Sequence, residues 1–412
     1  MRIIDVFFFL FLLTLSIDPT GFHSRLKDLL FVVLVVYGVI YCLKRQQYLA
    51  SINRITFLSF LLIPLWGMFI AYVTNSLTED SYAMSQIRSM LYIFIFFFVV
   101  TMRLDILLKM VWVNGIILAI LTLVLFSLSE LGGVFLAAIY DYCNVSGNYM
   151  MAYNRDFLGF SVNGLYYKTG SLIIFSYIYN LYQYKGPFKL VLSVILYLSL
   201  MVAGSRTPML VQTMILLVYL YDRNIIGKFM TRVATVAFLG MLVMLTYLLA
   251  TQENEGSNET KYENYESYVD DMSEKGHLIW GAGLGSEFYA KGRGVKLAYS
   301  ELSYLDVIRM YGIPVGGFMI FLFFAPCFWL WKYYSRSLFL KRYCLGYALF
   351  LVLSGTNPLL LGSVGLTALT LFMTIVNKSS WMELNKEQDL EKEETDRMND
   401  SEPLVIDNVV LR

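Results

Sequence analysis

The sequence predicts an all-α polytopic membrane protein with about twelve transmembrane helices. Of its 412 residues, 58% are hydrophobic and only 15% are charged, a composition well outside the usual range for soluble globular domains. Apolar segments long enough to cross a hydrocarbon core of roughly 30 Å as helices recur along almost the whole chain. Because little polar sequence remains between them, we expect no water-soluble enzyme domain.

The expected spans are the apolar runs between polar or charged connections. We interpret the first run as a retained helix, because a polar segment follows it in place of the small-residue cleavage site of a signal peptide. Several runs are short, so tilting, local thinning or re-entrant insertion is expected there. The spans are residues 3–17, 27–43, 55–73, 87–102, 106–128, 165–182, 188–203, 208–221, 233–250, 303–331, 343–355 and 359–376.

The orientation follows from the basic residues, which collect in every second connection and therefore mark the cytoplasmic side. These residues are Lys44, Arg45, Arg54, Arg103, Lys109, Lys185, Lys189, Arg223, Lys228, Arg232, Lys332, Arg336, Lys341 and Arg342. An even number of spans then places both termini in the cytoplasm, in agreement with Arg2 and Lys378. We expect one transmembrane domain over residues 1–380, periplasmic loops at 129–164 and 251–302, and an acidic disordered cytoplasmic tail at 381–412.

Positive charge is scarce on the outer side, so the arginines there are candidates for anion binding. Arg206 is the most specific, because the turn Gly-Ser-Arg-Thr-Pro is short and Pro208 suits the first turn of the next helix. A guanidinium near a helix N-terminus can bind phosphate or carboxylate through two parallel hydrogen bonds. Arg88, Arg155, Arg293 and Arg309 also fall on or near this side. A helix-end anchor that reaches lipid phosphate explains any one of them about equally well.

The second long outer loop has two parts of different character. Residues 251–275 are acidic and polar, and a solvated mobile loop is the expected state. Residues 276–317 contain Gly281, Gly283 and Gly285, which resemble half of a dinucleotide-binding fingerprint without its strand-helix-strand setting. We expect these glycines to form tight turns or to let the backbone approach a ligand closely. Lys291, Arg293 and Lys296 add positive charge.

A helix is expected to begin in the segment Ser300-Glu301-Leu302-Ser303-Tyr304 and to run into the next span. Glu301 and Tyr304 share one face of this helix, and Asp306 can meet Arg309 three residues later. One interpretation makes Glu301 a partner of the helix dipole and the other two residues a local ion pair. The other makes Glu301 a general base beside a pocket at the membrane face.

Other kinds of chemistry have little support in the sequence. The two histidines and four cysteines show no metal-ligand spacing, so we expect no metal site, no cofactor and no disulfide framework. A basic stretch with interleaved aromatic residues is missing, which argues against nucleic-acid binding. The first outer loop concentrates Tyr, Asn and Asp around Arg155, which suits either sugar rings or an ordinary packed loop.

In this order, the features resemble the O-antigen polymerase and O-antigen ligase superfamily of bacterial membrane glycosyltransferases. The resemblance lies in about a dozen spans, the Ser205-Arg206-Thr207 turn, the external segment Gly281-Ala282-Gly283-Leu284-Gly285, and the segments Glu301-Leu302-Ser303-Tyr304-Leu305 and Tyr311-Gly312-Ile313-Pro314-Val315-Gly316-Gly317. The ligase branch typically carries a His-Asn pair where this chain has Glu301-Leu302. That difference favours a polymerase of the Wzy type.

The resemblance implies a metal-independent and nucleotide-independent transfer at the periplasmic face of the bacterial inner membrane. A growing glycan on polyprenyl diphosphate would be the donor and a lipid-linked repeat unit the acceptor. Arg206, with Arg88 or Arg309, would bind the diphosphate, and Glu301 would orient or deprotonate the attacking hydroxyl. Arg155, Arg293 and Tyr304 complete the expected substrate-binding set. A chain-length regulator and a flippase would be protein partners.

Two alternatives remain. An O-antigen ligase would use nearly the same residues with a different acceptor. A lipid-linked oligosaccharide flippase or other transporter would also fit twelve spans with both termini inside. A flippase should line its interior with charge at the middle of the membrane, whereas the expected spans are nearly free of charge in their middles, with Lys168 near one end as a partial exception.

Overall fold

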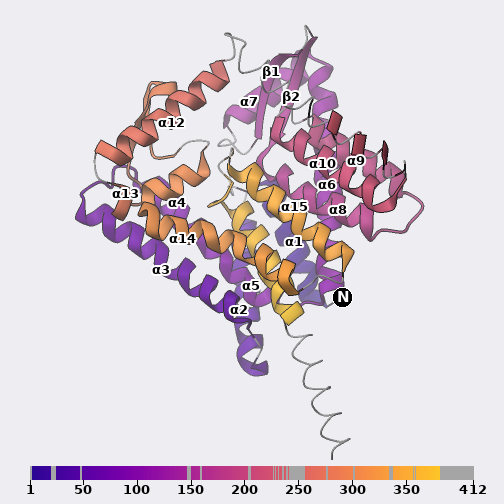
Figure 1. Ribbon diagram of the computed structural model, residues 1–412, viewed down its shortest axis with the longest axis horizontal. Coiled ribbons are helices and arrows are strands. Elements are labelled where there is room, and N and C mark those ends of the chain that lie inside the picture. The colour runs from indigo at the N-terminus through magenta and orange to yellow at the C-terminus, as the bar shows by residue number, and fades with distance from the viewer. Residues whose placement is uncertain are drawn as a thin grey trace, which may run out of the picture.

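The protein is described by a computed structural model. It describes residues 2–19, 25–46, 49–145, 150–157, 160–202, 206–225, 256–274, 277–299, 302–333, 337–355 and 359–380, together with 227, 229–230, 232–233, 236–237, 240 and 357. These residues form a mainly α-helical molecule with two small antiparallel hairpins (Figure 1). The expected acidic tail at 381–412 lies outside the described residues.

The helices of the first half are α1 (Ile3–Ile17), α2 (Leu26–Arg45), α3 (Ser51–Val73), α4 (Asp80–Met90), the 3-10 helix η1 (Leu91–Ile95), α5 (Phe96–Val99), α6 (Leu104–Glu130) and α7 (Gly133–Val145). A hairpin of β1 (Met150–Phe157) and β2 (Phe160–Tyr167) follows, with Met150 opposite Tyr167. The chain continues through η2 (Lys168–Leu172), α8 (Ile173–Tyr182), α9 (Lys189–Met201) and α10 (Arg206–Arg223).

The second half begins with α12 (Gly256–Glu274) and α13 (His277–Trp280). A short hairpin of β3 (Phe288–Ala290) and β4 (Val295–Leu297) encloses η3 (Lys291–Arg293). The last elements are α14 (Ser303–Tyr333), α15 (Leu338–Gly355) and a further helix over residues 363–380.

Six helices in the described residues are long and apolar enough to cross a membrane: Leu26–Arg45, Ser51–Val73, Asp80–Val99, Leu104–Glu130, Ser303–Trp331 and Leu338–Gly355. Ile3–Ile17, Gly133–Cys143 and Lys189–Met201 are apolar but shorter. The multi-pass membrane class is therefore supported, while twelve full spans are not. The expected span 165–182 is wrong as a continuous helix, because strand β2 continues to Tyr167 and α8 has only ten residues.

The outer helices carry apolar stripes that face away from the protein. Helix α2 exposes Leu29, Val32, Val36, Ile40 and Leu43, whose spacing follows one face of a helix. Helix α3 does the same with Leu58, Leu62, Leu65, Phe69 and Tyr72. Contiguous apolar surface of this extent is normal against lipid and is rare on soluble monomers.

Helix α8 lies in the interior of the molecule. Its residues Ile173, Ile174 and Phe175 are fully buried, and the Phe175 ring lies 5.5 to 5.7 Å from the rings of Tyr343, Phe350 and Phe372. These partners come from α15 and the helix over 363–380. A helix surrounded by protein needs no contact with lipid, so its length is not set by the thickness of the bilayer.

The segment 251–275, expected as a mobile loop, forms helix α12 over most of its length. Buried polar and apolar residues recur on one face at helical spacing: Asn264, Ser267, Tyr268, Asp271 and Met272. Because three of these residues are polar, the face has no obvious apolar stripe. The sequence pattern therefore did not reveal an amphipathic helix.

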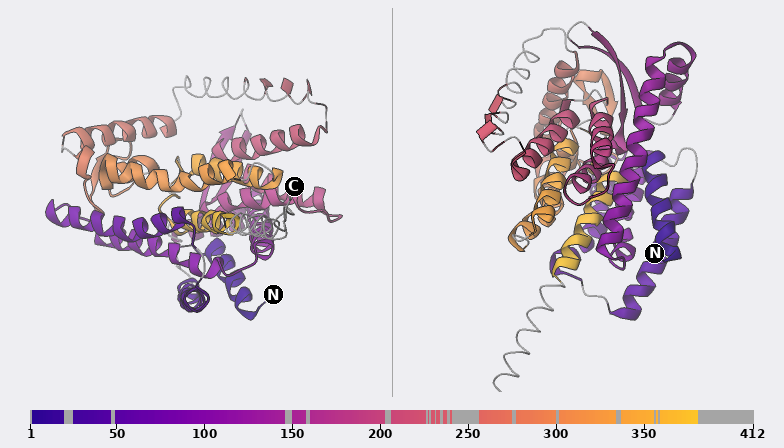
Figure 2. Two further views of the ribbon diagram at one scale, coloured as in Figure 1. Left: turned by 60° about the horizontal axis from the view of Figure 1, so that its bottom comes forward. Right: turned by 90° about the vertical axis from the view of Figure 1, so that its right-hand side faces the viewer.

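Helix α12 and the hairpin β1–β2 lie toward the same end of the molecule, at the top of Figure 1, whereas the N-terminus is marked lower down. The right-hand view of Figure 2 again places this hairpin at the end away from the N-terminus. Both elements belong to the two long connections expected on the outer side. We refer to this end as the loop end.

Candidate functional site

The site region is organised around the turn formed by Gly281 to Ser286. Gly281, Gly283 and Gly285 have φ angles of +85°, +88° and +80°, values that L-residues with a Cβ adopt at a cost. A Cβ on Gly283 would lie 2.5 Å from the backbone of Ala71 in α3, and one on Gly281 would lie 2.4 Å from the carbonyl oxygen of Met310. The glycines therefore let this turn pack directly against the backbones of two helices.

A break in helix α14 receives this turn. Gly312 has φ +75° and ψ 166°, which interrupts the helix. Pro314 has no N–H to donate to the carbonyl of Met310, four residues earlier. The N–H of Gly283 donates to that carbonyl instead, at 3.1 Å, and the N–H of Ala282 donates to the carbonyl of Arg309 at 2.7 Å. The carbonyls of Arg309 and Met310, just before the Tyr-Gly-Ile-Pro motif, thus accept hydrogen bonds from the Gly-Ala-Gly-Leu-Gly motif.

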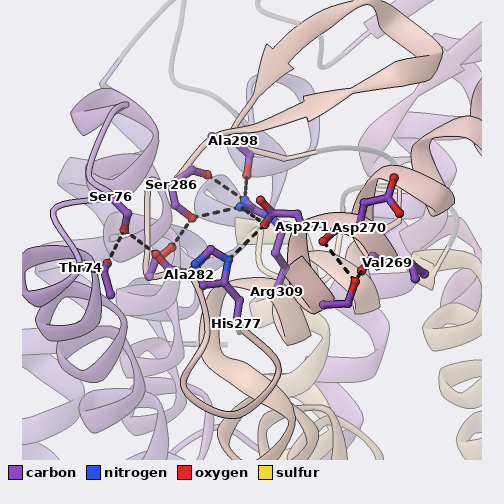
Figure 3. A network of polar contacts seen from close by, with 12 residues as sticks. Thr74, Ser76, Val269, Asp270, Asp271, His277, Ala282, Ser286, Ala298 and Arg309 are labelled. Carbon is purple, nitrogen blue, oxygen red and sulfur yellow. Dashed lines mark hydrogen bonds and ion pairs between the residues drawn. The ribbon is translucent and has the colours of Figure 1, made fainter. Parts of the chain in front are cut away.

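Arg309 fixes the surrounding loop segments to α14 (Figure 3). Its side chain is fully buried, and it donates to Ser286 Oγ at 3.1 Å and to the carbonyls of Ser286 and Ala298 at 2.8 and 2.7 Å. Asp271 Oδ2 lies 3.8 Å from its guanidinium, which stacks 4.7 Å from the centre of the Phe288 ring.

Two further polar contacts attach α12 to this region. The hydroxyl of Tyr268 donates to the carboxylate of Asp306, and Asp271 Oδ2 lies 3.3 Å from His277 Nδ1. Figure 3 shows Asp271 between Arg309 and His277. Burial of these groups without partners would be unfavourable, so the contacts position α12 over the start of α14.

Beside this network lies a cavity of about 260 Å³. Its wall includes three cationic residues, Lys27, Arg88 and Lys168, and one carboxylate, that of Asp306. Tyr82, Tyr92 and Tyr299 supply aromatic surface, and the remaining lining residues are Pro19, Ser85, Gln86, Ser89, Ser303, Met310, Leu359, Leu361, Gly362, Ser363 and Val364. The cavity therefore combines hydroxyl groups, aromatic faces and a net positive charge.

The lining residues come from the ends of several elements. Lys27 is the second residue of α2, Lys168 begins η2, Ser303 begins α14 and Ser363 begins the final helix. At the other ends of α2, α14 and the final helix lie the basic residues expected in the cytoplasm, Lys44, Lys332 and Lys378. The cavity is thus at the side predicted to be periplasmic.

The cavity wall is held by polar contacts to Asp28 and by a stacked pair of tyrosine rings. Arg88 pairs with the carboxylate of Asp28, which also accepts a 2.9 Å hydrogen bond from the Tyr92 hydroxyl. The rings of Tyr82 and Tyr299 are stacked, with centres 4.8 Å apart and planes inclined by 8°. Burial, and secondarily the charge of Glu79, raises the pKa of Tyr299, so its hydroxyl is protonated near neutral pH.

Of the predicted site residues whose side chains are described, only some line the cavity. Arg88 lines the cavity, whereas Arg309 is fully buried and is not among the lining residues. Tyr304 donates its hydroxyl to the carbonyl of Leu351 at 2.6 Å and is not among the lining residues. Arg293 is exposed in η3.

The side chains of three predicted residues lie outside the described part of the structure. Helix α10 begins at Arg206 and contains Pro208 in its first turn, as expected, but the Arg206 side chain lies outside the description. The same holds for the Arg155 side chain in strand β1. Glu301 lies outside the described residues.

Lys27, Lys168, Tyr82 and Tyr299 line the cavity but were not among the predicted site residues, and Asp306 was predicted only as an ion-pair partner. A signal existed for the lysines, since both fall near outer ends of expected spans, where positive charge is scarce. Among the basic residues of that side, only arginines were predicted to bind substrate. The stacked tyrosines come from segments more than 200 residues apart, a proximity that no local pattern reveals.

Comparison with known proteins adds no assignment: models of protein families give no match, and a search of curated proteins gives none. Inferences about function therefore rest on the residues and geometry of this chain.

Proposed function

We propose that the chain is a polysaccharide polymerase of the O-antigen type. It transfers a glycan from polyprenyl diphosphate onto a lipid-linked repeat unit at the periplasmic face of the bacterial inner membrane. The observation that carries this proposal is the cavity at the loop end, where Lys27, Arg88 and Lys168 meet Asp306 and the stacked tyrosines. The cations suit the diphosphate of the donor, and the tyrosines suit the sugar rings of both substrates.

The cationic side chains suit the leaving group. In the transfer, the hydroxyl oxygen of the acceptor sugar attacks the anomeric carbon of the donor glycan, and the bond from that carbon to the diphosphate oxygen breaks. The lipid diphosphate departs with the electron pair, so negative charge develops on it. Cations held at that position stabilise the charge more in the transition state than in the ground state.

The proton of the attacking hydroxyl requires an acceptor, and the start of α14 supplies carboxylates. Asp306 lines the cavity and already accepts a hydrogen bond from Tyr268. Glu301, the residue chosen from the sequence, lies two positions before the helix begins. We assign proton transfer to this helix start, with Asp306 as the described candidate and Glu301 as the second.

Sugar rings suit the aromatic side of the cavity. Their C–H faces pack on aromatic rings while their hydroxyls bond to neighbouring polar groups. Tyr299, partly exposed and stacked on Tyr82, offers such a surface, and Ser85, Gln86 and Ser89 lie nearby in the wall.

The start of α10, which carries Arg206, lies near this site. Pro208, two residues later, lines a small space together with Tyr167 and Gly170. Lys168 lies between Tyr167 and Gly170 in the chain and lines the larger cavity described above. The backbone therefore brings the start of α10 to the segment that carries one of the cavity cations.

The test measures surface glycan length in a deletion strain that expresses variants at equal levels. Arg88→Ala, Asp306→Asn, Arg206→Ala and Glu301→Gln are expected to lower polymerisation, each by roughly 10²-fold where the side chain acts in the transition state. Arg103→Ala is the matched control for Arg88→Ala, because Arg103 also pairs with one aspartate, Asp105, but at the opposite end. It should retain long chains.

The glycan of the deletion strain separates the related functions. A single repeat unit at the surface supports a polymerase, long chains retained on the carrier lipid indicate a ligase, and a loss of export indicates a flippase. Normal long chains from both Asp306→Asn and Glu301→Gln would refute proton transfer by the start of α14.

A further inference from the structure

A second hollow lies next to the cavity, between α2 and the segment from α4 to η1. Its volume is about 460 Å³, and it is lined by Arg25, Asp28, Phe31, Val32, Arg88, Leu91 and Tyr92. Arg88 and Tyr92 also line the polar cavity. The two spaces therefore share a wall, formed by Arg88 and Tyr92 with Asp28 between them.

One side of this groove faces the region expected to be lipid. Val32 and Leu91 are 55% and 43% exposed, and Val32 belongs to the apolar stripe of α2 that continues through Val36 and Ile40. The groove thus opens sideways from the protein, whereas the adjoining cavity is partly polar and lies between helix ends.

The other side of the groove is positively charged. Arg25 is exposed at the start of α2, and Arg88 presents its guanidinium to Asp28. Behind Tyr92, the Lys27 ammonium lies 5.4 Å from the centre of the tyrosine ring. The groove lining therefore holds two cations, Arg25 and Arg88, and one carboxylate, Asp28, while Lys27 interacts electrostatically with both Asp18 and Asp28. An added anion with two negative charges can compete with Asp28 for the two guanidinium groups.

We propose that this groove is the side entrance and binding site for a prenyl diphosphate lipid. The isoprenoid chain lies along Phe31, Val32 and Leu91 in contact with the bilayer, and the diphosphate binds Arg25 and Arg88. The diphosphate replaces Asp28 on Arg88, which brings the attached sugar toward the cavity and its tyrosines. The inference deepens the proposed function, on which the choice of a prenyl diphosphate rests.

This binding mode explains why the protein has an apolar groove beside a polar cavity. A glycolipid of this class has an apolar chain and a charged, sugar-bearing head, joined at the diphosphate. The protein has an apolar groove and a polar cavity, joined at Arg88. An anionic molecule without the chain, such as inorganic diphosphate, would use only the cationic half of the site.

The experiment measures binding to the purified full-length chain in lipid nanodiscs. The probe is a tritiated fifteen-carbon prenyl diphosphate, and the competitors are inorganic diphosphate and phosphatidylglycerol. We expect the prenyl diphosphate to bind at least tenfold more tightly than inorganic diphosphate and to resist competition by phosphatidylglycerol. Arg88→Ala should weaken both diphosphates about tenfold, and Arg103→Ala should weaken neither.

Apolar variants test the groove itself. Leu91→Gln and Val32→Gln should weaken the prenyl diphosphate about threefold to tenfold and leave inorganic diphosphate unchanged. Val36→Gln is the matched control, since Val36 is 53% exposed on the same stripe but does not line the groove. It should bind the probe normally.

The inference would be overturned if the prenyl diphosphate and inorganic diphosphate bound with equal affinity. It would also be overturned if phosphatidylglycerol competed with the probe as well as unlabelled prenyl diphosphate does, or if Val36→Gln weakened probe binding as much as Leu91→Gln. These results would leave the polymerase proposal standing if the deletion strain still displays single repeat units. Conversely, tight prenyl diphosphate binding in a protein whose deletion leaves glycan length unchanged would support the groove and refute the polymerase.

Discussion

At the level of single residues, Arg88 and Arg309 illustrate how burial determines what an arginine can do. Arg309 is fully buried, and it binds two backbone carbonyls and a serine. Its charge holds loop segments together. The Arg88 side chain is 53% exposed and pairs with one carboxylate, an interaction that solvent weakens. An incoming anion can therefore compete for Arg88 at little cost to the fold.

We predict that truncation of Arg309 destabilises the fold far more than truncation of Arg88. Arg309→Ala should lower the free energy of unfolding by roughly 3–5 kcal/mol, because two buried carbonyls and Asp271 lose their charged partner. Arg88→Ala should change it by about 1 kcal/mol or less. Thermal unfolding of both variants in detergent tests this difference. A normal melting temperature for Arg309→Ala, combined with lost polymerisation, would indicate a direct role in the reaction instead.

Residue identity alone could not separate these arginines. Both lie near the predicted outer side, and the sequence assigned both to substrate binding. Arg88 remains available because its helix ends beside an open space, whereas Arg309 is enclosed by α12, the β3–β4 hairpin and the glycine turn. These contacts join residues that are 11 to 38 positions apart in the chain, so they depend on the tertiary fold.

At the level of elements, the site depends on a fit between a glycine turn and a broken helix. The sequence correctly indicated tight turns at Gly281, Gly283 and Gly285, because few other residues adopt positive φ readily. It did not identify what approaches them. The approaching groups are the protein's own backbones in α3 and α14, and Pro314 leaves an acceptor at Met310 for the turn.

Gly283→Ala is predicted to disrupt this fit far more than Gly294→Ala. Both glycines have positive φ, +88° and +66°, so both variants incur a backbone cost of roughly 1–2 kcal/mol. Only at Gly283 would the new Cβ lie 2.5 Å from another backbone, while nothing lies within 4 Å at Gly294. Limited proteolysis in detergent should show faster cleavage of the first variant only. Similar cleavage rates for both would contradict the close packing against α3.

At the level of the whole molecule, hydrophobicity predicted the membrane class but not the number of spans. A hydropathy pattern identifies apolar helices, yet it does not distinguish a helix in lipid from one enclosed by other helices. Helix α8 is of the second kind, because protein surrounds its short length. The last helix, over residues 363–380, is also largely buried. Counting apolar runs therefore gave more full spans than the six long helices of the described residues.

The positive-inside pattern makes a separate prediction about the orientation of the complete molecule. If α12 lies outside the cytoplasm, Tyr262→Cys should react with a membrane-impermeant maleimide in cells whose outer membrane alone is permeabilised, since Tyr262 is 64% exposed. Arg103→Cys, whose native side chain is 77% exposed, should react only after the inner membrane is opened. The unmodified chain, with its four native cysteines, gives the background. The reverse labelling pattern would place the cavity on the cytoplasmic side, where the proposed polymerisation of exported repeat units could not occur.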